Sequence, residues 1–237
     1  MRMNALRHIA MTLGLLLSAS VGLAQTPTER IYRFDFADGS RGWQGDFADY
    51  PAGEEEFYQL TWGFARLPDY LAANRFAMTL RGHNYSDDLS MFLRRKISGL
   101  APDTAYTVQF RVTIASNAPE GAIGIGGPPG EGVVLKAGAM LERPFADPLT
   151  RTLNVDKGIQ SNDGTDAIVL GHIGVDTPIS RPAYRLKTLE NSEKAFTLRT
   201  DETGEAWLLI ATDSGFEGAT RIYVVSASFR FTPAGPD

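Results

Sequence analysis

The sequence contains no cysteine and only three histidines among its 237 residues. Without cysteine the chain can form neither a disulfide framework nor a thiolate metal site, and it lacks the lipid-bearing cysteine of a bacterial lipoprotein. A zinc site built from three histidines would need His8, which belongs to the N-terminal stretch described next. The stability of the folded chain must therefore come from the burial of a hydrophobic core.

Long apolar runs are also scarce, and the main one lies at the N-terminus. Residues 1–24 combine Arg2 and Arg7 with the apolar run 9–17 and a following stretch of small residues, which is typical of a secretory signal peptide. We expect residues 25–237 to be exported to the periplasm or the extracellular space, with no membrane insertion after cleavage. Loss of the two arginines would change the formal charge from −5 to −7, which excludes nucleic acid as an expected partner.

The remaining sequence is dominated by short segments in which polar and apolar residues alternate. The clearest runs from Thr104 to Ile114 and predicts a strand with one buried face, formed by Tyr106, Val108, Phe110, Val112 and Ile114. Similar alternation recurs at 76–80, 89–93, 196–198, 207–211 and 223–231, and no segment after residue 24 has a helical stripe. The pattern predicts an all-β antiparallel two-sheet sandwich, organised as one domain over 25–237 with a long insertion at about 117–182.

Several of these segments resemble the jelly-roll modules of the galactose-binding-like class. The similar stretches are Phe34-Asp35-Phe36 with Gly42-Trp43, then 97–106, 205–213 and 220–231. The resemblance implies a jelly-roll sandwich in which the first and last strands lie side by side, so that Phe34 and Phe36 approach Phe229 and Phe231. The stretches 124–132 and 212–218 resemble those of a group of exported bacterial proteins, which implies a compartment and no chemistry.

Aromatic and polar side chains that suit a sugar ligand are concentrated in one part of the sequence. Flat aromatic faces stack under pyranose rings, and polar side chains bond to the hydroxyl groups. The residues expected to bind saccharide or envelope polymer are Tyr58, Trp62, Arg81, Asn84, Tyr85, Asp87 and Asp88. Arg95 is added because the alternation of its strand points its side chain inward, where a charged guanidinium needs a partner. It must therefore be turned outward by a bulge, pair with an acid such as Asp87 or Glu217, or line a pocket.

A second cluster suggests a structural Ca²⁺. Asn154, Asp156, Asp163 and Asp166 supply oxygen ligands within one glycine-containing loop, although their spacing does not match the EF-hand template. The glycine-rich run 121–132 lacks the Lys-Ser/Thr ending of a phosphate-binding loop and predicts a surface loop before the strand 133–140. Lys136 and Lys157 could meet an anion, but single lysines of this kind are typically solvated.

No catalytic motif is present, so we expect an exported, non-catalytic protein that binds saccharide or envelope polymer. Two alternatives remain open. One is a hydrolase of envelope polymer that uses paired carboxylates among Asp87, Asp88, Asp213 and Glu217. The other is a structural or adhesion protein that pairs with another chain through a sheet face.

Overall fold

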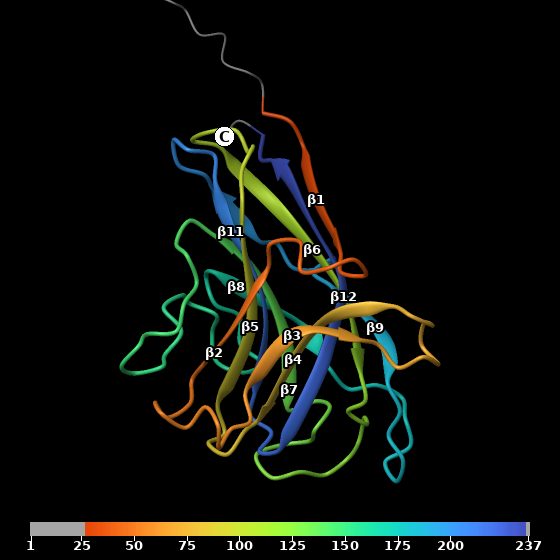
Figure 1. Ribbon diagram of the computed structural model, residues 1–237. Coiled ribbons are helices and arrows are strands. Elements are labelled where there is room, and N and C mark those ends of the chain that lie inside the picture. The colour runs from red at the N-terminus through yellow and green to blue at the C-terminus, as the bar shows by residue number, and fades with distance from the viewer. Residues whose placement is uncertain (1–26, 236–237) are drawn as a thin grey trace, which may run out of the picture.

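The computed structural model describes residues 27–235, which contain twelve β-strands joined by turns and loops (Figure 1). The signal peptide expected at 1–24 lies outside the described residues. Within them, no helix is long and apolar enough to cross a membrane. The strands are β1 (Arg30–Asp35), β2 (Gln44–Ala48), β3 (Thr61–Arg66), β4 (Phe76–His83), β5 (Leu89–Ile97), β6 (Ala105–Ser116), β7 (Val133–Met140), β8 (Ala167–His172), β9 (Arg185–Glu190), β10 (Thr197–Arg199), β11 (Ala206–Ser214) and β12 (Ala219–Pro233).

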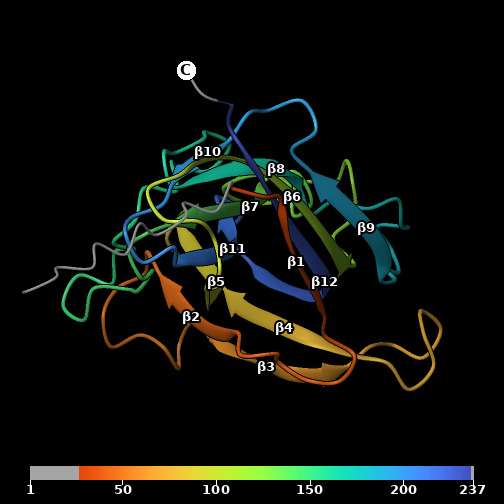
Figure 2. The same ribbon diagram turned by 90° about the horizontal axis from the view of Figure 1, so that it is seen from above.

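The strands form two antiparallel sheets that face each other, as the view from above shows (Figure 2). The seven-stranded sheet has the order β10-β6-β12-β4-β3, with β1 pairing with β12 and β9 pairing with β6. The five-stranded sheet has the order β2-β5-β11-β7-β8. The chain is thus an all-β, two-sheet antiparallel sandwich, as the alternating pattern predicted.

The core lies between the sheets because alternate residues of each strand point inward. On β6, the five residues predicted to be buried are at most 1% exposed, and their neighbours Thr107, Gln109 and Arg111 face solvent. A one-residue shift in register would exchange these two sets, so the burial of the apolar set fixes the register. The polar set of β6 is consequently held on the outer face of the seven-stranded sheet.

The first and last strands pair, as the family resemblance implied. In the β1–β12 ladder, Phe34 lies opposite Ala227 and Tyr32 lies opposite Phe229. The ring of Phe34 contacts Trp43 at 5.3 Å and Phe229 at 6.3 Å between ring centroids, both edge to face. This aromatic cluster forms part of the core between the sheets.

The segment 117–182 contributes to the second sheet. The glycine-rich run 121–132 is a loop that leads into β7, as predicted, and β7 lies between β11 and β8. Strands β2, β3, β8 and β9 lie at or near sheet edges, and their sequences have no clear alternation of apolar and polar residues. Partial exposure of their side chains explains this, since β3 and β9 have no fully buried residue.

Candidate functional site: a polar groove on the seven-stranded sheet

The outer face of the five-stranded sheet is covered by the chain itself. Residues 141–166 fold over it, and Leu153 and Val155 pack against Phe92, Leu209 and Ala211 from the sheet. All five side chains are buried. This face therefore presents no open sheet surface to a ligand at that position.

The outer face of the seven-stranded sheet is covered over only part of its area. Near β3 and β4, Leu67 and Tyr184 from flanking loops pack with Ala77 and Tyr223. The hydroxyl of Tyr70 accepts a hydrogen bond of 2.7 Å from the backbone N–H of Tyr184, which joins the two loops. The region over β1, β6, the C-terminal half of β12 and β9 is left open.

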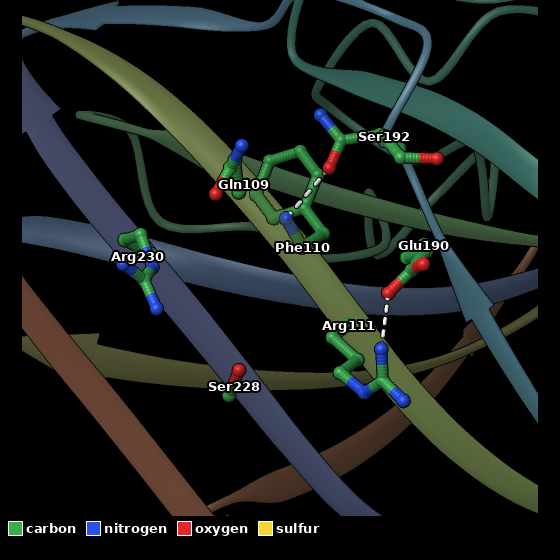
Figure 3. Close-up of a pocket in the computed structure, with 8 residues that line it drawn as sticks. Gln109, Phe110, Arg111, Glu190, Ser192, Ser228 and Arg230 are labelled. Carbon is green, nitrogen blue, oxygen red and sulfur yellow. Dashed lines mark hydrogen bonds and ion pairs between the residues drawn. The ribbon is translucent and has the colours of Figure 1, made fainter.

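Three adjoining hollows lie on this open region and its edge, and together they form what we call the polar groove. The first lies over β6, β12 and β9 and is lined by Gln109, Phe110, Arg111, Glu190, Asn191, Ser192, Ser228 and Arg230 (Figure 3). The second lies over β1, β12 and β6 and is lined by Arg33, Phe34, Asp35, Arg111, Thr113, Ser226, Ala227 and Ser228. The third turns the edge of β1 and is lined by Arg33, Phe34, Asp35, Arg41 and Arg95. Neighbouring hollows share residues, so the groove crosses the strands continuously.

Charged and hydroxyl side chains line the first two hollows. Arg111 on β6 donates to the carboxylate of Glu190 on β9, an exposed cross-strand ion pair marked by a dashed line in Figure 3. The hydroxyl groups of Thr113 and Thr188 lie 2.9 Å apart on the same two strands. These contacts hold the side chains in place while leaving most of their hydrogen-bonding capacity open to solvent.

The third hollow, the arginine hollow, is defined by Arg33, Arg41 and Arg95 with Phe34 and Asp35. Arg95 comes from β5 of the opposite sheet, and its guanidinium carbon lies 4.6 Å from the centre of the Phe34 ring. Burial lowers the pKa of Arg95 below its usual value. Of the three arrangements considered for Arg95, the structure shows the pocket-lining one, since Arg95 forms no ion pair with Asp87, Glu217 or any other described acid.

The other seven predicted ligand residues do not line the groove. Tyr58 is buried in the core, and Tyr85 is stacked between His83 at 4.1 Å and Phe57 at 4.3 Å. Both faces of Tyr85 are thus covered by rings, so no flat face is free for a sugar. Trp62 leans over the edge of the sandwich, where a Cβ on Gly45 would lie only 2.4 Å from its Cγ.

Three polar members of that prediction make hydrogen bonds within the chain. Arg81 donates to the side-chain oxygen of Gln59 at 3.0 Å. Asn84 is buried, and its amide donates to the carbonyls of Ser214 and Phe216 at 2.8 and 3.1 Å, which holds the turn after β11. The backbone carbonyl of Asp87 accepts from Gln160 at 3.2 Å. These residues were predicted to form one site because they are near one another in the sequence, but the topology places them away from the groove.

Lys136 and Lys157 are not solvated, contrary to expectation. Lys136 is fully buried on the outer face of β7, with its Nζ 2.9 Å from Asp213 Oδ2, and it also donates to the carbonyls of Lys157 and Asn162. Lys157 Nζ lies 2.9 Å from the same Asp213 oxygen and 3.3 Å from Asp49 Oδ2. Two buried ammonium groups therefore hold loop 157–162 on the sheet.

The electrostatics of this buried cluster follow from its charge balance. Burial lowers the pKa of Lys136, whereas the pKa of Lys157 is raised because Asp213, Asp49 and Asp88 together outweigh its desolvation. Burial, reinforced by Asp49, raises the pKa of Asp88 to about 6. With Asp88 protonated, two carboxylates balance two ammonium groups.

Those contacts bear on the hydrolase alternative. Asp213 is wholly buried and bonded to both lysines, so it has no face open to a polymer. Asp87 Oδ1 and Glu217 Cγ each lie 3.2 Å from the point where a Cβ on Gly126 would be. Asp213 therefore cannot serve as one member of a catalytic pair in this arrangement.

The residues predicted to bind calcium make hydrogen bonds and an ion pair within the chain. Asp156 accepts from the backbone of Gly158 and Thr165, Asp166 accepts from the backbone of Asp156, and Asp163 pairs with Lys194 at 3.0 Å. Asn154 instead bonds to Glu142 and to the backbone of Phe145. Across residues 27–235, no group of three or more His, Asp or Glu side chains is placed to hold a metal ion. Their side-chain oxygens accept hydrogen bonds from backbone N–H groups of the turns, which is the other common role of Asn and Asp in loops.

The groove residues were largely missed by the sequence interpretation, although a signal was present. The polar half of the alternation on β6 and β12 supplies Gln109, Arg111, Ser226, Ser228 and Arg230. Arg111 and Ser228 are paired across these two strands. Only knowledge of which strands are neighbours turns two separate polar rows into one surface.

No family model matches the chain, and no curated protein matches it either. Solved structures similar to it include three β-sandwich proteins. One comes from a study of the promiscuous specificity of carbohydrate-binding modules of the β-sandwich superfamily, with 14% identity and a TM-score of 0.39 over 81% of this chain, which spans only 58% of that one. The second is the CBM22-1 xylan-binding domain of Paenibacillus barcinonensis Xyn10C, with 9% identity, a TM-score of 0.41 and coverage of 89% and 99%. The third is the mannan-recognising module TmCBM27, with 12% identity, a TM-score of 0.40 and coverage of 85% and 97%. The strand pairings of the chain itself establish the sandwich.

Proposed function

We propose that this chain is an exported, non-catalytic protein that binds a saccharide or envelope polymer along the polar groove. The observation that carries the proposal is the continuity of the three hollows across an uncovered sheet face, through the shared residues Arg33, Arg111 and Ser228. A groove that crosses several strands suits an extended polymer more than a compact ligand.

The chemistry of the lining supports a polyhydroxylated ligand. Its outward side chains are hydroxyl, amide, carboxylate and guanidinium groups, which supply both donors and acceptors. The two phenylalanines among the lining residues are buried with less than a tenth of their surface exposed, so the surface of the groove is polar and not hydrophobic. Recognition would therefore depend on hydrogen bonds to hydroxyl groups, and not on the aromatic platform that the sequence suggested.

A blocking substitution tests the position of the site. Ser228 lies in the middle of the groove on the outer face of β12, and Ser228→Trp would fill the groove without altering the core. The matched control is Thr61→Trp, which places the same ring at an exposed outward position on β3 of the same sheet. The purified chain is applied to a glycan array and to immobilised polysaccharides.

We expect the chain to bind at least one polysaccharide class, with binding weakened at least tenfold by Ser228→Trp and unchanged by Thr61→Trp. Absence of binding across the array would overturn the proposed function. Binding that both tryptophan variants retain would instead place the saccharide site outside the groove and overturn the assignment made here.

A further inference from the structure

The arginine hollow holds more positive charge than its own acids balance. Arg41 pairs with Asp38 at 3.1 Å, and Asp35 is held by Arg75 at 2.9 Å. Neither Arg33 nor Arg95 has an ion-pair partner among the described residues. Two guanidinium charges are thus uncompensated at one edge of a chain whose formal net charge is −5.

Arg95 is the less solvated of these two guanidinium groups. It lies against the Phe34 ring, and the backbone of Gly42 lies beside it, with the Arg95 Nη1 atom 3.4 Å from where a Cβ on that glycine would be. A partly desolvated guanidinium that lacks an anionic partner is unfavourable, and an arriving anion offsets that cost. Arg95 lines the hollow together with Arg33 and Arg41, so its guanidinium is within reach of a ligand bound there.

The hollow is continuous with the rest of the groove. Arg33, Phe34 and Asp35 line both the arginine hollow and the second hollow over β1 and β12. A group bound between Arg33 and Arg95 would therefore belong to the same ligand that lies over Ser226 and Ser228. Guanidinium groups bind carboxylate and sulfate oxygens through paired N–H donors, which ties the expected group to a planar or tetrahedral oxyanion.

We propose that the arginine hollow binds the acidic substituent of an anionic saccharide, a uronate carboxylate or a sulfate ester, held between Arg33 and Arg95. This inference rests on the proposed function, because it names the class of saccharide that the groove would take. It predicts that the polymer bound is acidic and that its charge is recognised at one end of the groove.

The test compares four soluble polymers: polygalacturonate, dextran sulfate, neutral dextran and polyglutamate. Polygalacturonate and dextran sulfate present the two sources of the oxyanion, neutral dextran lacks it, and polyglutamate carries carboxylates without sugar. We expect at least one of the two acidic polysaccharides to bind at least tenfold more tightly than neutral dextran and polyglutamate, which corresponds to about 1.4 kcal/mol. The preferred polymer identifies the carboxylate or the sulfate as the group bound.

Variants locate the charge recognition. Arg33→Gln and Arg95→Gln should each weaken binding of the acidic polysaccharide five- to tenfold, and Arg95→Lys should restore part of the loss because it keeps the charge. Arg33 is exposed, so Arg33→Gln leaves the fold intact even if Arg95→Gln disturbs packing against Phe34. The matched control is Arg143→Gln, since Arg143 also lies over an aromatic ring, that of Trp207, on the outer side of the other sheet.

The outcomes separate this inference from the proposed function. Groove-dependent binding of neutral polysaccharides with no preference for acidic ones would overturn the inference and leave the proposed function standing. Equal binding of polyglutamate would show an anion site without sugar recognition and would overturn the inference. Failure of every polysaccharide on the array would overturn the proposed function together with the inference that rests on it.

Discussion

Lys136 Nζ and Asp213 Oδ2 lie 2.9 Å apart on neighbouring strands, and neither side chain has any exposed surface. Asp213 lies opposite Val134 in the ladder between β11 and β7, so this pair crosses the sheet diagonally. The carboxylate also accepts from Lys157 and from the backbone N–H of Gln160, both in the covering loop. One buried acid thus joins two strands to the loop that covers them.

Removal of that acid should be costly. Asp213→Asn would leave Lys136 and Lys157 buried beside a neutral amide, and breaking a buried ion pair by removing one partner costs about 3–5 kcal/mol. We expect the free energy of unfolding, measured by urea denaturation, to fall by that amount. The control is Asp176→Asn at an exposed position, which should change it by less than about 0.5 kcal/mol. An equally small effect of Asp213→Asn would show that the cluster does not hold the loop.

Asp88 predicts a specific pH dependence of stability. Its pKa in the folded chain is about 6, above the ordinary value of 3.8, because of burial and of Asp49. The folded state therefore binds this proton more tightly than the unfolded state, and the stabilisation present below pH 4 is lost as the pH rises through about 6. Asp88→Asn should remove this loss and raise the free energy of unfolding by about 1–2 kcal/mol at pH 7.5.

The measurement is urea denaturation between pH 4 and 8 of the unmodified chain and of Asp88→Asn. The neighbouring Asp87 is exposed, so Asp87→Asn serves as the matched control and should follow the unmodified chain. A difference between Asp88→Asn and the unmodified chain that does not vary with pH would contradict the assignment of this titration to Asp88.

The sequence was sufficient for the fold class because the alternation is strong where strands are central. β6 and β12 are flanked on both sides, so their inward residues are fully buried and their patterns are clear. β3 and β9 have partly exposed side chains on both faces and therefore carry no such pattern. The pairing of β1 with β12 came from the family resemblance, since nothing in the alternation specifies which strands are neighbours.

The site was harder to predict for the same reason. Arg33, Arg111 and Ser228 are separated by 78 or more residues along the chain, and only strand pairing brings them together. Tyr58 and Tyr85 do meet, with ring centroids 5.4 Å apart and edge to face, but they do not line the groove. Lys136 was misjudged because burial by a distant loop cannot be read from its own strand. Arg95 could be singled out from the sequence because its inward alternation conflicts with its charge, and that conflict is local; the structure shows that it lines a hollow.

Gly45 is required by the packing of Trp62 across the edge of the sandwich. A Cβ at residue 45 would come within 2.4 Å of the indole, so Gly45→Ala should displace the ring and cost about 1–3 kcal/mol. The displaced Trp62 should also shift tryptophan fluorescence to longer wavelength. On β3, a Cβ at Gly63 would meet nothing within 4 Å, so Gly63→Ala provides the matched control and should preserve both stability and emission. Equal behaviour of the two alanine variants would disprove this packing role.

The loop carboxylates predict insensitivity to calcium. Asp156, Asp163 and Asp166 already satisfy backbone N–H groups or Lys194, and a bound ion would have to displace those contacts. An ion that binds the folded state stabilises it in proportion to the logarithm of its concentration over Kd. We expect the Tm to change by less than about 1 °C between 5 mM CaCl₂ and 5 mM EDTA. A calcium-dependent rise of several degrees would show a site that the described contacts do not account for.

Arg111 should separate ligand binding from stability. Its ion pair with Glu190 is exposed, with 60% and 44% of the two side chains accessible, and such surface pairs contribute about 0–1 kcal/mol. Arg111→Gln should therefore leave the free energy of unfolding nearly unchanged, yet weaken polysaccharide binding about tenfold, because the side chain lines both the first and the second hollow. Lys194→Gln breaks an exposed pair of similar accessibility, with Asp163, outside the groove and should change neither quantity. If Arg111→Gln reduced both stability and affinity, the residue would belong to the framework of the sheet and not to a binding surface. If the variant bound polysaccharide as tightly as the unmodified chain, the ligand would not occupy the centre of the groove.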